Sequence, residues 1–365
     1  MQRLSAGQRR LLRQWSPAFF AAGAAWLLLL FVGATPLVRA SGLALAILGV
    51  TAGMRPMGFV ASIAGGLTLA LCPVFWSQTG GSESQQATTG VATALAVVVM
   101  ILASTLLRRR DLGIGLGITV FLLIFWSQIG TAQSLRLTGL VTAWLLYLLV
   151  DMILLTNPRP GIKPAAAPKA WHTFGLLFLF VMGAVNDPLV TLFAPAIVLA
   201  LLLSYAKLPR WYWAAVLLSV CGGLLLLVRA YLPPQATYIN LLAWREAIRW
   251  IELGELIITQ FSIFGIVLGL IGLARLSRWY PPLGVVTMIA YAAYVFFGLV
   301  YNGSHREILL LPLTIIQVMW MTYAVNTFGQ WVNKSLENDS GLWIHVISAI
   351  YFVLPAILLL NIVQF

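Results

Sequence analysis

The chain has 365 residues, of which 61% are hydrophobic and only 9% are charged. A water-soluble fold of this length has no need of so much apolar surface, so the composition excludes a soluble globular domain. The formal net charge of +12 is explained by membrane topology rather than by nucleic-acid binding, because the basic residues fall in short gaps between apolar stretches.

Thirteen apolar stretches follow one another along the chain. A helix needs about 20 mostly apolar residues to cross a bilayer. The better candidates are 18–34, 57–76, 91–107, 112–127, 137–155, 188–206, 211–228, 257–274, 282–300, 308–326 and 343–362. Two more, 42–54 and 172–185, are short. Either their flanking residues extend them to the length of a span, or they are re-entrant segments. The sequence therefore predicts an all-α, polytopic transmembrane helix bundle of about 12–13 spans.

Basic residues fall mainly in every second gap. Alternate gaps lie on opposite sides of the membrane. Of the 22 Lys and Arg residues, 16 fall on one side, and the side with fewer holds only Arg39, Arg136, Arg229, Arg245, Arg249 and Arg306. By the positive-inside rule the richer side faces the cytoplasm. We therefore expect a multi-pass protein of the cell (inner) membrane, with the N-terminus cytoplasmic and, with thirteen spans, the C-terminus outside.

Cysteine and histidine offer no metal or cofactor site. Cys72 and Cys221 both lie within apolar spans and are interpreted as small core residues. His172, His305 and His345 are spread over both predicted faces without ligand spacing, which argues against a metal or an intramembrane haem. No phosphate loop, nucleophile elbow or dinucleotide fingerprint occurs, so no cofactor is expected.

Two internal features divide the chain. Phe75–Gln78 recurs as Phe125–Gln128, which indicates either a duplicated helix pair or two copies of an aromatic belt. A Pro-rich inner segment at 157–171 is the expected linker between membrane halves at 1–156 and 172–365. Around 240–253, an amphipathic helix is predicted in the outer interface, with Asn240 as its N-cap.

Most candidate site residues fall on the predicted outer side. They are Glu83, Asp187, Arg245, Arg249, His305, Arg306 and Glu307. Ionisable groups at membrane depth are functional candidates, although at span ends they also serve as interface anchors and ion pairs. The inner acidic residues Asp111, Asp151, Glu337 and Asp339 are interpreted as solvated or headgroup-level charges.

Three stretches resemble GT-C membrane glycosyltransferases of the protein-mannosyltransferase type. They are Ala70–Gln78 followed by Glu83, Gly183–Asp187 followed by Leu192–Pro195, and Val300–Asn302 followed by Glu307–Pro312. The resemblance covers roughly residues 57–326. It implies a bundle of long helices with an outward-facing cavity for a lipid-phosphate sugar donor.

The chain departs from that family in its first outer loop, Gly33–Gly42. The family places its catalytic acid there, whereas this loop contains Arg39 and no Asp or Glu. A guanidinium cannot act as a general base. The resemblance is therefore to a degenerate member of the family.

Three functions follow as hypotheses. The first is a non-catalytic accessory or structural subunit of a larger membrane complex, such as a respiratory or photosynthetic electron-transfer assembly. Its partners would be the lipid bilayer and other membrane subunits, with a bound lipid or quinone and no nucleic acid. The second is a glycosyltransferase with Glu83 or Asp187 as base and the basic outer residues on the lipid phosphate. The third is a transporter or flippase of a lipid-linked substrate, which the internal repeat favours.

Overall fold

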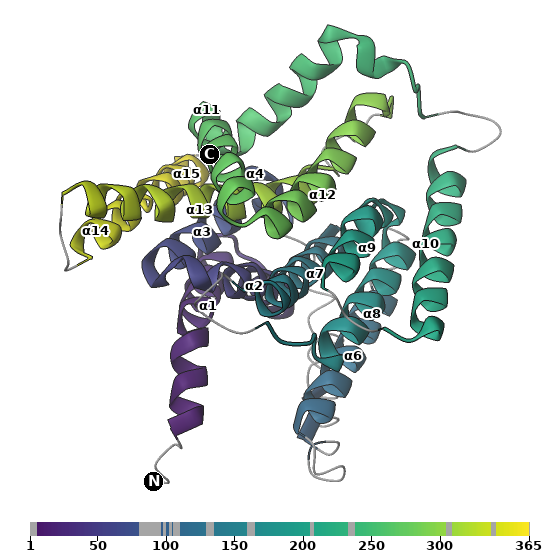
Figure 1. Cartoon of the computed structure of the whole chain (residues 1–365). Helices are drawn as coiled ribbons and strands as arrows, with labels where there is room; N and C mark the ends of the chain where they lie inside the picture. Colours follow the sequence, from purple (N-terminus) through teal and green to yellow (C-terminus); the bar gives the residue numbers. More distant parts are fainter. Residues whose placement is uncertain are drawn as a thin grey trace.

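The computed structural model is an all-α bundle (Figure 1). It describes residues 6–79, 96–97, 100–101, 104, 110–128, 135–158, 165–204, 208–232, 238–303, 309–336 and 341–364. Within these ranges there is no β-strand, and an isolated bridge joins Ile239 to Tyr301. The all-α class predicted from the sequence is confirmed.

The helices follow the apolar stretches in chain order. Their bounds are α1 Ala6–Phe31, α2 Leu37–Met54, α3 Phe59–Leu71, α4 Pro73–Trp76, α6 Arg110–Gln128, α7 Leu135–Thr156, α8 Ala170–Asn186, α9 Ala194–Leu203, α10 Arg210–Tyr231, α11 Ala247–Trp279, α12 Pro281–Val300, α13 Leu310–Ser335, α14 Leu342–Ile350 and α15 Val353–Gln364. Short 3-10 helices add η1 Arg55–Met57, η3 Pro188–Phe193 and η4 Ala243–Arg245.

Among the described residues, seven helical segments are long and apolar enough to cross a membrane. They are Arg13–Phe31, Arg39–Met57, Thr138–Thr156, Arg210–Tyr231, Ala247–Trp279, Pro281–Val300 and Leu342–Val363. Shorter apolar helices lie at Phe59–Leu71, Ala170–Asn186 and Pro188–Leu203. The short stretch at 42–54 is therefore extended by its flanks. These helices indicate a membrane protein, while the total of 12–13 spans stays a prediction.

Helix α13 lies at the centre of the bundle. It packs against α3, α7, α11, α12 and α14. Its side chains Ile315, Val318 and Met321 have no exposed surface. Helix α11 approaches α13 so closely that a Cβ on Gly272 would overlap the backbone carbonyl of Trp320. Such close contact through a small residue is typical of helix packing in membranes.

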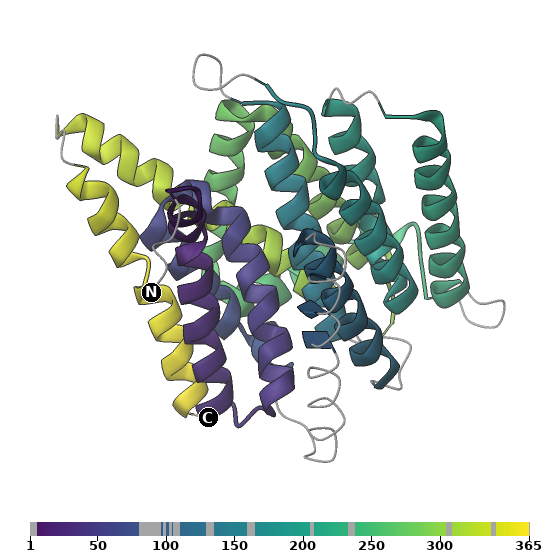
Figure 2. The same cartoon turned by 90° about the horizontal axis from the view of Figure 1, so that it is seen from below.

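The outer helices present apolar side chains away from the core. Leu218 and Leu225 on α10 are 74% and 71% exposed, and Phe264 on α11 is 73% exposed. Figures 1 and 2 place α10 at one edge of the bundle and α14 at the opposite edge. Surface of this kind is stable in lipid but not in water. Cys221 is also exposed on α10, so its interpretation as a core residue is wrong, whereas Cys72 is buried.

At 240–253 the chain forms a turn, the 3-10 helix η4 and the first part of α11, and the place of this segment in the outer interface stays a prediction. Asn240 does cap a turn, because its Oδ1 accepts a hydrogen bond from the Leu242 N–H at 3.1 Å. The chain then forms η4, leaves helical geometry at Glu246, and starts α11 at Ala247. Helix α11 continues to Trp279 with a kink at Ser262, whose φ is 61°. The extended backbone at Glu246 therefore sets the start of the helix at Ala247, later than the predicted start at Asn240.

The proposed division at 157–171 stays a prediction. Helix α7 from the first half packs directly against α8 and α13 from the second half, and a hydrophobic core includes residues from both. The repeat is likewise untested. Its first copy lies in α4 and the turn that follows, while the side chains of its second copy lie outside the described residues.

Candidate functional site

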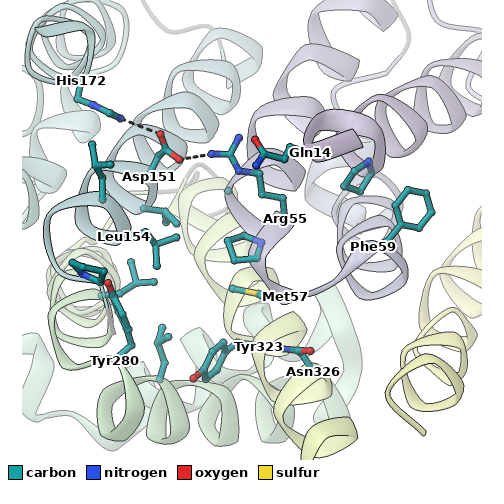
Figure 3. Close-up of a pocket in the computed structure, with 18 of the residues that line it drawn as sticks. Gln14, Arg55, Met57, Phe59, Asp151, Leu154, His172, Tyr280, Tyr323 and Asn326 are labelled. Carbon is teal, nitrogen blue, oxygen red and sulfur yellow. Dashed lines mark hydrogen bonds and ion pairs between the residues drawn. The ribbon is translucent and has the colours of Figure 1, made fainter. Parts of the chain in front are cut away.

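A cavity of about 660 Å³ opens where the ends of several helices meet (Figure 3). We call it the Arg55 cavity. Its described lining residues are Arg13, Gln14, Pro17, Gly53, Arg55, Pro56, Met57, Phe59, Val150, Asp151, Leu154, Leu155, Pro158, Lys169, His172, Leu276, Leu283, Tyr280, Tyr323, Asn326 and Gln330. They come from α1, α2, η1, α3, α7, α8, α11, α12 and α13 and their connections. The distribution of Lys and Arg predicted that all these helix ends lie on the same side of the membrane. In the structure these helix ends lie together around the cavity.

An ionic network forms one wall of the cavity. Arg55 in η1 donates a hydrogen bond from its guanidinium to Asp151 Oδ1 on α7. Asp151 Oδ2 lies 3.0 Å from Nε2 of His172, in the first turn of α8. Figure 3 shows the carboxylate of Asp151 between the other two side chains. The sequence interpretation of Asp151 as a solvated or headgroup-level charge did not include these partners; both it and Arg55 are 23% exposed.

The backbone fixes the tautomer of His172. The Lys169 N–H donates to Nδ1 of His172 at 3.2 Å. Because Nδ1 accepts this bond, the ring proton resides on Nε2 and is donated to Asp151. His172 is 1% exposed, and the ring of Trp171 stacks on it at 3.9 Å. The arrangement therefore fixes the orientation of the imidazole against the carboxylate of Asp151.

Aromatic rings position the guanidinium of Arg55. Its central carbon lies 5.4 Å from the ring centroid of Trp15 and 5.7 Å from that of Tyr147. The two rings are themselves 5.5 Å apart, and Tyr147 also stacks on Trp171 at 6.2 Å. Cation–π contacts of this kind restrain an arginine while leaving its N–H groups available.

The cavity combines positive charge with apolar surface. Arg13, Arg55 and Lys169 contribute three positive charges and Asp151 one negative charge, so with His172 neutral the described lining has a formal charge of +2. The rest of the lining is largely apolar, with Pro17, Met57, Val150, Leu154, Leu276 and Leu283. Such a site attracts an anion that carries an apolar group.

The opposite wall carries uncharged polar groups. Figure 3 shows Tyr280, Tyr323 and Asn326 across the cavity from the ionic network. The Tyr280 hydroxyl donates to the backbone carbonyl of Ile153 at 3.3 Å, which ties α7 to the start of α12. These groups can donate or accept hydrogen bonds but add no charge.

Asp187, a predicted site residue, lies away from this cavity, at the end of α8. It is 1% exposed. Its Oδ2 accepts a hydrogen bond from the Thr138 hydroxyl at 3.0 Å, and its Oδ1 accepts one from the Leu189 N–H at 3.0 Å. Asn186 in turn donates to the Thr138 hydroxyl at 3.2 Å. The carboxylate thus caps η3 and joins it to α7.

Of the predicted outer residues, Arg245 is exposed, whereas the side chain of Arg249 is only 19% exposed. Arg245 lies 5.5 Å from the ring of Trp244. Arg249 bonds to Asn302 and pairs with Glu246 and Glu252 at 3.6 and 3.7 Å. Their role in binding a lipid phosphate stays a prediction. Glu83, His305, Arg306 and Glu307 lie outside the described residues.

The sequence interpretation missed Arg55, Asp151 and His172 as a unit. One signal was present, because Asp151 interrupts an otherwise apolar stretch, and an acid in such a position generally has a partner. In the part of the chain that the structure covers, no three His, Cys, Asp or Glu side chains gather in a way that could hold a metal ion. Asp151 and His172 are joined by a hydrogen bond of 3.0 Å.

Together, the fold and the cavity define an α-helical protein of the membrane type with an ionic site at one end of the bundle. Comparison with known protein families, with curated proteins and with solved structures gave no match. The GT-C resemblance is therefore carried only by the short stretches of sequence that suggested it.

Proposed function

We propose that this protein is an integral membrane protein that binds an anionic amphiphile, with the acidic headgroup at Arg55 and the apolar tail against the adjoining helices. The observation that carries the proposal is the composition of the Arg55 cavity, whose lining combines a formal charge of +2 with a mainly apolar surface. Neither feature alone distinguishes a lipid from a soluble anion or from an uncharged apolar ligand.

The location of the cavity supports this choice. It opens between the ends of helices that are apolar enough to cross a membrane. At the end of a membrane span the polar headgroups of lipids meet the protein, and basic pockets between helices bind acidic headgroups there. The positive-inside count favours the cytoplasmic side for this end.

This role fits the first hypothesis from the sequence, an accessory subunit that contributes lipid or quinone contacts to a larger membrane complex. The exposed apolar faces of α10 and α11 offer surface for lipids or for other subunits. For the glycosyltransferase hypothesis, the buried position of Asp187 and its bonds to Thr138 and Leu189 favour a structural role over that of a general base. The flippase hypothesis also requires a lipid ligand, and it adds the movement of that lipid from one face of the membrane to the other.

The test is a comparison of matched arginine variants. The full chain is reconstituted in phosphatidylcholine nanodiscs, and binding of phosphatidylglycerol is measured by native mass spectrometry. Arg55→Gln removes the guanidinium of the cavity, whereas Arg278→Gln removes an exposed arginine of α11 that does not line it.

We expect Arg55→Gln to weaken binding about tenfold, because a hydrogen bond to a charged group contributes about 1.5–3 kcal/mol. We expect Arg278→Gln to have little effect, since an exposed charge is screened by solvent. Equal retention of the acidic lipid by the two variants would refute the proposal.

A further inference from the structure

We infer that the Arg55 cavity selects a lipid phosphomonoester, which carries close to two negative charges, over a phosphodiester lipid, which carries one. The inference rests on the proposed function and adds the chemical class of the headgroup. It follows from the number of charges in the cavity and from the way Arg55 is held.

The charge balance is the first argument. Arg13 on α1, Arg55 in η1 and Lys169 before α8 come from three separate elements, and Asp151 offsets one of their charges. A phosphodiester leaves one positive charge of the lining uncompensated. A phosphomonoester near neutral pH carries about −1.5 to −2 and matches the lining almost completely.

The geometry of Arg55 is the second argument. A guanidinium has five N–H donors, of which the carboxylate of Asp151 engages only a part. Trp15 and Tyr147 contact the guanidinium and restrain its position before a ligand arrives. The remaining donors suit the two-point hydrogen bonding that arginine forms with phosphate oxygens. Preorganisation of this kind lowers the entropic cost of binding.

The two other cations are placed to complete the site. Arg13 and Lys169 both line the cavity and are exposed, so their long side chains can reach a phosphate held at Arg55. The apolar lining next to them, with Met57, Leu154 and Leu283, accommodates a tail rather than free phosphate.

The experiment compares two lipids with the same acyl chains, phosphatidic acid and phosphatidylglycerol, on the full chain in phosphatidylcholine nanodiscs. Wild-type protein is expected to prefer phosphatidic acid about tenfold, as one further unit charge within a few ångströms implies. Lys169→Gln lowers the charge of the lining to +1 and should abolish most of that preference. The matched control Lys334→Gln removes an exposed lysine of α13 that does not line the cavity. This variant should retain the preference for phosphatidic acid.

A second variant guards against misfolding of Lys169→Gln. Arg13→Gln also lowers the charge of the lining to +1 but leaves the pair of Arg55 and Asp151 in place, and it should likewise abolish most of the preference. Retention of the preference by this variant would overturn the inference. A third arm adds glycerol 3-phosphate, which has the same phosphomonoester without a tail. If it displaces phosphatidic acid at equal concentration, the ligand is a soluble phosphate ester and the lipid assignment fails.

The results separate the inference from the proposed function. If both lipids bind equally, and Arg55→Gln still weakens both, the proposed function holds and the selectivity inference is wrong. If neither lipid depends on Arg55, the proposed function itself fails. Retention of the preference by Lys169→Gln would also contradict the charge argument.

Discussion

The ion pair between Arg55 and Asp151 provides the sharpest test of the site's structure. We expect the single changes Arg55→Gln and Asp151→Asn each to destabilise the protein, and the double change to cost less than their sum. An exposed pair contributes up to about 1 kcal/mol, whereas breaking a buried pair costs about 3–5 kcal/mol. Because both side chains are 23% exposed, we expect an intermediate coupling energy of about 1–2 kcal/mol.

The coupling energy is measured with a double-mutant cycle. The free energy of unfolding of wild type, both single variants and the double variant is obtained by titration with SDS in mixed micelles, and unfolding is followed by tryptophan fluorescence. Trp15 and Trp171, two of the 14 tryptophans that contribute to the signal, lie beside the network. Additivity of the two changes within about 0.5 kcal/mol would show that the pair does not form, and the reasoning would fail.

Three further changes and one control variant test the fold. Gly272→Ala should destabilise the protein by about 1–3 kcal/mol, because its methyl group overlaps the backbone of Trp320, while Gly222→Ala on α10 meets no neighbour and should be neutral or stabilising in the same SDS titration. Ser262→Gly should raise the unfolding temperature, since glycine adopts a φ of 61° without the strain of about 1–3 kcal/mol that a side chain brings; a lower temperature would contradict the kink. Asp187→Ala should cost about 2–3 kcal/mol by leaving a buried N–H and a hydroxyl unpaired, and an unchanged unfolding curve would exclude its capping role.

Composition and hydropathy were sufficient to predict the all-α class and its apolar helices, because the membrane leaves few alternatives to a helix, while the number of spans stays a prediction. The extension of 42–54 into Arg39–Met57 follows the same physics, since a chain that enters a bilayer stays helical until its backbone can reach water. The helix predicted at 240–253 begins at Ala247 rather than after Asn240, and the cause is local. Glu246 adopts extended backbone between η4 and α11, and a hydrophobic pattern alone does not report such a break.

The candidate site depended on packing that a single sequence does not contain. Arg55 and Asp151 are separated by 96 positions, and Asp151 and His172 by 21. They meet because α2 packs against α7 and α7 against α8. The exposure of Cys221 has the same origin, because an apolar span gives no sign of which of its faces meets protein and which meets lipid.

The most direct test of the account is to map where an anionic lipid lies on the protein. A phosphatidic acid with a photoreactive group near its headgroup is incorporated into phosphatidylcholine nanodiscs with the full chain, irradiated, and the labelled peptides are identified by mass spectrometry. The account predicts label at lining residues of the Arg55 cavity such as Met57, Leu154 and Tyr280, and its loss in Arg55→Gln. Label spread over the exposed faces of α10 and α11, with no enrichment at the cavity, would contradict it.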